Sequence, residues 1–132
     1  MRVIALDHLV LTVRNIERTC EFYERVLGMK TVTFAAGRKA LAFGSQKINL
    51  HEVGKEFEPK ASQPTPGSAD FCLLADSPLA EVAAHLNRLG VNLVEGPGGR
   101  TGAVGLIDSV YIRDPDANLV EIAVYRNAAA DS

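Results

Sequence analysis

The chain has 132 residues, of which 47% are apolar, and a formal net charge of -2 at pH 7. This size and composition are typical of a single domain with its own hydrophobic core, so we expect one domain over residues 1–132. The weak charge provides no basic surface for nucleic acid, no apolar run approaches the ~20 residues that span a membrane, and no secretory signal is evident. Two cysteines are too few for a disulfide framework. We expect a cytoplasmic protein that binds a small molecule, with no nucleic-acid or membrane partner.

The first part of the chain, residues 3–54, is predicted to form a βαβββ module. β-Branched residues and leucine predict a strand over Val3–Val13. Apolar residues at helical spacing, between the capping residues Asn15 and Gly28, predict a helix over Ile16–Leu27. Three apolar runs separated by glycine turns predict the remaining strands, Met29–Ala35, Lys39–Phe43 and Lys47–Val53.

The second part, residues 68–125, follows a polar, proline-containing crossover over 55–67 and repeats the same order. It begins with a strand over Ser68–Ala75 and a helix over Leu79–Leu89. The predicted strands that follow are Val91–Glu95, Asp108–Arg113 and Leu119–Tyr125. Between the first two of these lies a predicted glycine-rich loop, Gly96–Ala103, and residues 126–132 are predicted to be a tail.

The spacing of the two parts indicates an internal duplication. Gly28 follows His8 by 20 residues, and Gly90 follows Asp70 by 20 residues. Superposing the modules places Asn49 on Glu121, with the extra residues of the second module falling around the glycine-rich loop. An insertion that leaves the flanking strands in phase is more often functional than structural.

Glu121 is the most informative polar residue, because its strand is apolar on both sides. A carboxylate in such a strand needs either a cation or a basic partner, since a buried unpaired charge is costly. The sequence leaves both alternatives open: a metal ion, or an ion pair with a basic residue such as Arg113 or Arg38.

Two histidines join Glu121 as candidate metal ligands. His8 begins an apolar strand, and His51 lies two residues beyond Asn49, on the same face of its strand. A histidine in an apolar strand can also be an ordinary core residue. Two imidazoles and one carboxylate suit Zn, Fe, Ni or Mn and leave positions open for substrate, and Asp70 could complete or replace one ligand.

The glycine-rich loop carries Arg100 and Thr101, which could close over an anionic or carbonyl substrate. Its spacing matches neither a Rossmann nor a Walker motif, so no nucleotide is implied. The alternative is a flexible loop without a role in binding.

Three stretches resemble the vicinal oxygen chelate superfamily, which includes glyoxalase I, bleomycin-binding proteins and extradiol dioxygenases. They are Leu6–Val13, Phe22–Met29 and Arg113–Glu121. The chain is most similar to the glyoxalase domain-containing protein 5 group, through Gln46–His51 and Gly99–Ala103.

The resemblance implies an α+β fold, in which two tandem βαβββ modules form a curled, half-barrel mixed sheet around a central cleft that holds one divalent metal. His8 and Glu121 match the first-strand and last-strand ligands. The two other ligand positions hold Asn49 and Asp70, where the family often has glutamate and histidine. Ala117 occupies a turn position where the family usually has glycine, at a cost of order 1 kcal/mol if that position needs a positive φ.

We therefore predict a metal-dependent, glyoxalase-like lyase or isomerase that acts on a small oxygen-chelating substrate. His8, His51 and Glu121 would hold the metal (Zn, Ni, Mn or Fe), and Glu121 and Asp70 would be catalytic. Asn49, Arg100 and Thr101 would bind substrate. An extradiol-type dioxygenase and a metal-free, drug-binding protein of the bleomycin-resistance kind are the alternatives. A homodimer is expected, because open sheets leave an edge and an apolar face to cover.

Overall fold

The computed structural model describes residues 1–126, so most of the predicted tail lies outside the described residues. The chain divides into two compact units, Met1–Ala69, which contains module one, and the part that begins at Asp70, which contains module two. Each unit is described separately below. Neither helix found within residues 1–126 is long and apolar enough to span a membrane.

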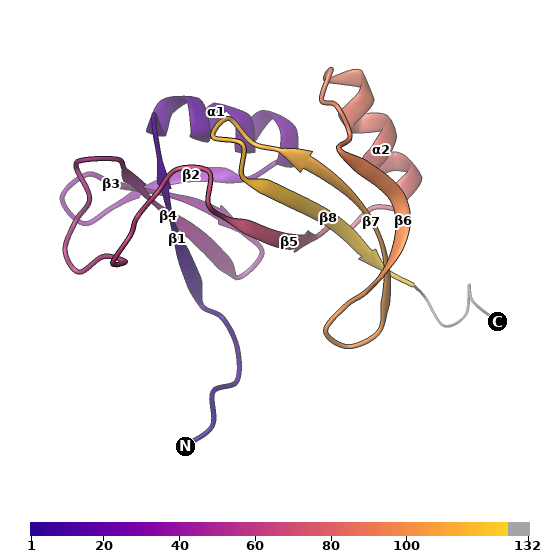
Figure 1. Ribbon diagram of the computed structural model, residues 1–132, viewed down its shortest axis with the longest axis horizontal. Helices are drawn as coiled ribbons and strands as arrows, with labels where there is room; N and C mark the ends of the chain where they lie inside the picture. Colours follow the sequence, from indigo (N-terminus) through magenta and orange to yellow (C-terminus); the bar gives the residue numbers. More distant parts are fainter. Residues whose placement is uncertain (127–132) are drawn as a thin grey trace. The chain divides into compact units, whose positions relative to one another are not determined.

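Module one is a four-stranded mixed sheet with one helix (Figure 1). Its strand order is β1-β4-β3-β2, with β1 parallel to β4 and the other neighbours antiparallel. The elements are β1 (His8–Val13), α1 (Ile16–Leu27), β2 (Lys30–Phe34), β3 (Arg38–Phe43) and β4 (Gln46–Glu52).

Helix α1 begins and ends where the sequence predicts. The Asn15 side chain accepts a hydrogen bond from the Arg18 backbone N–H at 2.9 Å, and Gly28 closes the helix at φ 68°. Tyr23 and Val26 on α1 are buried against one face of the sheet. That face is made of alternate residues of the strands, all buried: Leu11, Val13, Leu41, Ile48 and Leu50.

Module two has the same topology, with strand order β5-β8-β7-β6 (Figure 1). β5 is parallel to β8, and the other neighbours are antiparallel. The elements are β5 (Asp70–Leu74), α2 (Leu79–Arg88), β6 (Glu95–Thr101), β7 (Leu106–Arg113) and β8 (Leu119–Tyr125). The buried core combines Leu86 of α2 with alternate strand residues, Val110, Ile112, Val120 and Ile122.

The strand register confirms the α+β class and the duplicated βαβββ order. His8 pairs with Lys47 in module one, and Asp70 pairs with Leu119 in module two. Asn49 and Glu121 each lie two residues beyond these partners, so they are structurally equivalent, as the superposition of the sequences predicts. The half-barrel and its central cleft depend on how the modules are arranged, and they stay a prediction.

Three predicted elements are wrong in their extent. The first strand begins at His8 rather than Val3, and residues 1–7 lie outside any strand and are exposed. The predicted strand Val91–Glu95 is irregular up to residue 94. The glycine-rich segment is not a loop: most of it forms β6, which pairs with β7 through an irregular register between Glu95 and Gly98. Backbone pairing with β7 outweighs the low strand propensity of glycine. A Cβ on Gly96 would lie 2.5 Å from the Ser109 carbonyl oxygen, which explains why glycine is needed there.

The turn between β7 and β8 is built on one buried carboxylate. Asp114 accepts hydrogen bonds from the backbone N–H groups of Asp116 and Asn118 and from the Asn118 side chain, at 2.9, 3.0 and 2.9 Å. Ala117 has φ 67°. The condition under which alanine carries a strain cost at this position is therefore met.

Candidate functional site

The candidate site residues of module one share the face of the sheet opposite α1, which we call the helix-free face. Pairing of His8 with Lys47, Val10 with Asn49 and Thr12 with His51 places these side chains on one side. The other side carries the buried leucines and isoleucine that pack under α1. His8, Asn49 and His51 therefore face the same way, as predicted.

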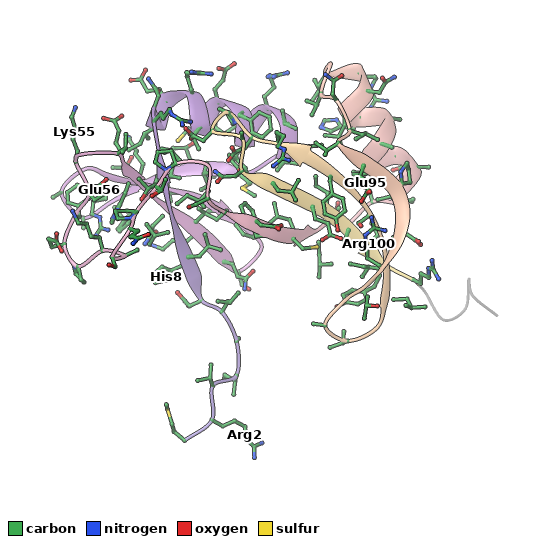
Figure 2. All side chains as sticks on the ribbon, in the orientation of Figure 1. Arg2, His8, Lys55, Glu56, Glu95 and Arg100 are labelled. Carbon is green, nitrogen blue, oxygen red and sulfur yellow. The ribbon has the colours of Figure 1, made fainter. Side chains whose placement is uncertain are left out.

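His8 stands at the start of β1 (Figure 2). The preceding residue orients its imidazole. The ring Nδ1 lies 2.8 Å from Asp7 Oδ2, and 43% of the histidine side chain is exposed. When Nδ1 carries the proton that it donates to Asp7, Nε2 keeps its lone pair. A carboxylate that orients a histidine in this way is the usual outer partner of a metal-ligating imidazole.

Asn49 occupies the middle of β4 on the same face and is 6% exposed. Its side-chain Oδ1 is buried and has no hydrogen-bond partner among the described residues. A buried amide oxygen without a donor is costly, and such an atom needs a ligand, a water or a cation to satisfy it.

His51 lies at the far end of β4 from Lys47 and is 3% exposed. Since His8 pairs with Lys47 and His51 with Thr12, the two histidines are four residue steps apart, or ~13 Å along the strands. The His51 Nε2 lies 3.3 Å from Arg38 Nη2, and burial, followed by the charge of Arg38, lowers the pKa of this histidine. The register thus associates His51 with Arg38 and separates it from His8.

Two phenylalanine rings surround this arginine. The Arg38 guanidinium carbon lies 5.3 Å from the Phe34 ring centroid and 4.7 Å from that of Phe57, which belongs to the crossover segment. The Phe57 ring also contacts His51, with ring centroids 5.8 Å apart. Lys47 Nζ lies 3.8 Å from the Phe34 centroid, so the same ring contacts two cations.

In module two, Glu121 lies at the centre of the corresponding face. It pairs with Cys72 on β5 and Tyr111 on β7. Its Oε2 is buried and has no hydrogen-bond partner among the described residues. Burial first, and then the charge of the Glu121 carboxylate and a hydrogen bond to it, raise the pKa of the Cys72 thiol to about 11, which keeps the thiol protonated at neutral pH.

The ion-pair alternative for Glu121 is not found within residues 1–126. Arg113 donates to the Ala117 carbonyl oxygen at 3.3 Å, and Arg38 is engaged with His51. No described basic side chain forms a salt bridge with Glu121. The carboxylate therefore keeps one buried oxygen available for a cation or a proton.

The remaining predicted site residues of module two lie at its margins. Arg100 forms an ion pair with Glu95 on the same strand and lies over the Tyr111 ring, with 5.5 Å between its guanidinium carbon and the ring centroid (Figure 2). Thr101 ends β6 and is exposed, as is Asp70 at the start of β5.

Within residues 1–126, no group of three or more His, Cys, Asp and Glu side chains gathers closely enough to hold a metal ion. Each module therefore offers single donors rather than a complete ligand set. His8 in module one and Glu121 in module two are the donors whose chemistry suits a divalent metal: an oriented imidazole and a buried carboxylate oxygen without a partner.

Sequence reasoning missed Tyr111, Cys72 and the cluster around Arg38. The two-residue period of β3 and β4 carries the signal for Arg38. Ala40 pairs with Asn49, and one further two-residue step along each antiparallel strand brings Arg38 opposite His51. Phe57 could not be found in this way, because it lies in a segment without regular structure.

Known proteins similar to this chain cover nearly its whole length. A family model described as the glyoxalase/bleomycin resistance protein/dioxygenase superfamily matches residues 5–122. Virulence protein STM3117 of Salmonella typhimurium is 57% identical over 125 residues, which make up 95% of this chain and 87% of that protein. The glyoxalase domain-containing protein RDO1 of Mycosarcoma maydis is 55% identical over 128 residues, 97% of this chain and 72% of that protein.

Solved structures share the fold. The crystal structure of STM3117 matches with a TM-score of 0.94 and 56% identity, covering 96% of this chain and 100% of that one. The crystal structure of a lactoylglutathione lyase from Agrobacterium tumefaciens matches with a TM-score of 0.69 and 25% identity, covering 91% and 92% of the two chains.

Proposed function

The chain belongs to the glyoxalase/bleomycin resistance protein/dioxygenase superfamily, and from that premise we propose that it is a metal-dependent, glyoxalase-like lyase or isomerase. Its substrate would be a small molecule that offers two oxygens to one divalent metal, Zn, Ni, Mn or Fe. The similarity to a lactoylglutathione lyase structure supports the reaction class. The finer likeness to the glyoxalase domain-containing protein 5 group remains a prediction.

The observation that carries this proposal is the buried Glu121 Oε2, which has no hydrogen-bond partner within residues 1–126. Leaving a carboxylate oxygen buried and unsatisfied costs several kcal/mol unless a cation or a proton neutralises it. A divalent metal supplies that charge. The apolar residues next to Glu121, Val120 and Ile122, are buried, so the carboxylate cannot turn to the helix-covered face for water.

His8 would be the module-one ligand. The hydrogen bond to the carboxylate of Asp7 fixes the ring so that Nε2 presents its lone pair to a metal. We propose Asp70, the structural counterpart of His8, as a further ligand or as a base beside the metal. Asn49, the counterpart of Glu121, would use its unpartnered amide oxygen to bind substrate or metal.

The residues further from these donors would hold the substrate. We assign His51 to the substrate end rather than the metal, because four residue steps separate it from His8 along the paired strands. Arg100, held by Glu95 and Tyr111, would line the site from β6, with Thr101 beside it.

When bound, the metal would act as a Lewis acid that stabilises an enolate or oxyanion as negative charge develops on substrate oxygen. Glu121 and Asp70 are the carboxylates available to accept a substrate proton. The protonated Cys72 beside Glu121 keeps a second negative charge out of its immediate surroundings.

Elemental analysis of the purified protein, after growth with added zinc, nickel, manganese and iron, tests the proposal. We expect about one metal per chain, falling below about one-tenth in His8→Ala and Glu121→Gln. The matched controls His85→Ala and Glu81→Gln, both on α2, should retain the metal. A His51→Ala variant that loses as much metal as His8→Ala would return His51 to the ligand set.

The alternatives separate in the same preparation. Metal below about one-tenth of an equivalent in the parent protein, even after all four ions are supplied, would contradict the enzyme and favour a metal-free binding protein. With metal present, turnover of a hemithioacetal supports the lyase. Oxygen uptake with a catechol would support the extradiol-type dioxygenase instead.

We also propose that the protein is a homodimer. Apolar side chains before and within β1 are exposed, with Ile4 90%, Leu6 70% and Val10 45% accessible. A second copy of the chain could cover this apolar surface, which is adjacent to His8. Light scattering behind size exclusion should give twice the chain mass of 14.2 kDa, and a monomer at all concentrations would contradict the proposal.

A further inference from the structure

The first unit carries two positive charges on its helix-free face that no carboxylate neutralises. Arg38 and Lys47 both lie against the Phe34 ring, at 5.3 and 3.8 Å from its centroid. Neither forms a salt bridge with any of residues 1–126. Two cations against one ring repel each other, and a bound anion would relieve that repulsion.

Arg38 is held in place before any ligand arrives. Its guanidinium lies between the rings of Phe34 and Phe57, and Nη2 contacts His51 at 3.3 Å. Its Nε is buried and has no hydrogen-bond partner in the part of the chain that the structure describes. A guanidinium that is fixed by stacking, with an unused donor, loses little side-chain entropy when it binds an anion.

The two carboxylates whose charges act on His51, those of Glu56 and Glu58, are both paired with a lysine. Glu56 accepts the Gly54 backbone N–H at 2.8 Å and pairs with Lys60 at 3.6 Å. Glu58 also pairs with Lys60, at 3.5 Å. His51 cannot supply a negative charge, and its imidazole accepts a hydrogen bond from Arg38 when neutral. The cationic pair is therefore left for a ligand from outside the unit.

We propose that Arg38 and Lys47 bind the anionic oxygens of a small-molecule substrate, either a carboxylate or a phosphate ester. The planar donor edge of arginine matches both groups, and lysine adds a second positive charge. This inference adds a substrate class to the proposed function. Anion binding itself does not depend on that function, but the statement that the bound anion is a substrate rests on it.

The strand register sets the position of this anion site relative to His8. Arg38 pairs with Phe34 and lies at the level of His51, four residue steps, or ~13 Å, along the sheet from the level of His8. Lys47 itself pairs with His8, and its side chain extends along the face so that Nζ reaches the Phe34 ring at 3.8 Å. The anionic group of the substrate is then a different group from the two oxygens that would reach a metal at His8. The substrate class is an extended anion rather than a compact dicarbonyl.

The test is a titration of the full chain, freed of metal with a chelator, with inorganic phosphate and separately with glutarate. The Arg38 Nε–H resonance in ¹⁵N spectra reports binding directly. We expect it to shift with at least one probe, and Arg38→Gln to weaken binding of that probe, followed on backbone amides of β3 and β4, about tenfold. The probe that binds more tightly indicates whether the anionic group of the substrate is a phosphate ester or a carboxylate.

Two further variants keep the outcome decisive. Arg38→Lys keeps the charge but not the planar donor edge, and should recover only part of the affinity, which separates recognition from loss of packing. Arg18→Gln removes an exposed charge from α1, which covers the other face of the same sheet, and should leave binding within about twofold.

The inference is overturned if neither anion shifts the Arg38 resonance, or if Arg38→Gln binds as tightly as the parent. Because the titration is done without metal, it does not test metal binding. Its failure would therefore leave the proposed function intact. Conversely, a parent protein without metal would contradict the proposed function while anion binding at Arg38 persists.

Discussion

The two modules have the same topology, but the side chains on their helix-free faces carry charges of opposite sign. The register makes Asn49 and Ala40 of module one equivalent to Glu121 and Tyr111 of module two. One two-residue step further along, Arg38 and His51 correspond to Ser109 and Ala123. Module one thus presents cations and a histidine, and module two a half-buried carboxylate.

The comparison indicates that the duplication preserves the packing of the helix-covered faces. The modules differ mainly at alternate strand positions, on the helix-free faces. On the helix-covered faces the equivalent residues, such as Leu41 and Ile112, are both apolar and fully buried. On the helix-free faces they differ in charge and size. Substitutions at equivalent positions of the two modules therefore distinguish residues that stabilise the common fold from residues that give each module its own charge.

The largest expected effect is on the shared scaffold. Leu41→Ala and Ile112→Ala each remove a fully buried side chain at equivalent positions of β3 and β7. Each should lower the free energy of unfolding by about 2–5 kcal/mol, because lost contacts and a residual cavity add together. Urea unfolding followed by circular dichroism measures the loss. A change below about 1 kcal/mol in either variant would show that its module does not contribute to the cooperative core.

A smaller effect is expected at the turns before β4 and β8. Module one uses Gly44 at φ 52°, where a Cβ would meet nothing within 4 Å, and module two uses Ala117 at φ 67°. Ala117→Gly should stabilise and Gly44→Ala should destabilise the protein, each by about 1 kcal/mol, because only glycine adopts this backbone without strain. Thermal unfolding checks both signs, and a loss of stability in Ala117→Gly would contradict the account of that turn.

The smallest expected effect concerns the pKa of His51. Burial first, and the charge of Arg38 second, lower this pKa, while Glu56 and Glu58 act in the opposite direction. Arg38→Gln should raise the pKa toward the ordinary value of about 6.5 without reaching it, since burial remains. A titration of the imidazole by NMR measures the shift, and an unchanged or lower pKa would exclude the influence of Arg38.

The same lowered pKa fixes the sign of a pH effect on stability. The unfolded chain binds a proton at His51 at a higher pH than the folded chain does. The favourable contribution is therefore complete above the unfolded value of about 6.5 and is lost as the pH falls through the folded pKa. His51→Gln should remove this part of the pH dependence. Urea unfolding between about pH 5 and 7, the range in which histidine ordinarily titrates, can detect the change.

Much of this fold can be predicted from the sequence because its signals are local. The Asn15 and Gly28 caps and the equal spacing from His8 to Gly28 and from Asp70 to Gly90 predict the duplicated modules, which the register confirms. The glycine-rich strand β6 could not be predicted, because its conformation comes from pairing with β7 rather than from its own side chains.

The candidate site was predictable only in part, for a related reason. The period of two placed Asn49 and His51 on one face of β4, but the position of His8 relative to them depends on how β1 and β4 are aligned, which the sequence does not specify. Phe57 contacts Arg38 and His51 from an irregular segment, and no periodicity marks such a contact in advance.

The central proposal is that His8 and Glu121 bind the same cation. A titration with Co²⁺, followed by its visible absorption, tests this most directly in the parent, His8→Ala, Glu121→Gln and the double variant. The account predicts about one tight site per chain in the parent, loss of that site in each single variant, and no further loss in the double variant, because both residues act on one ion. Tight Co²⁺ binding that survives in either single variant, or losses that add in the double variant, would contradict it.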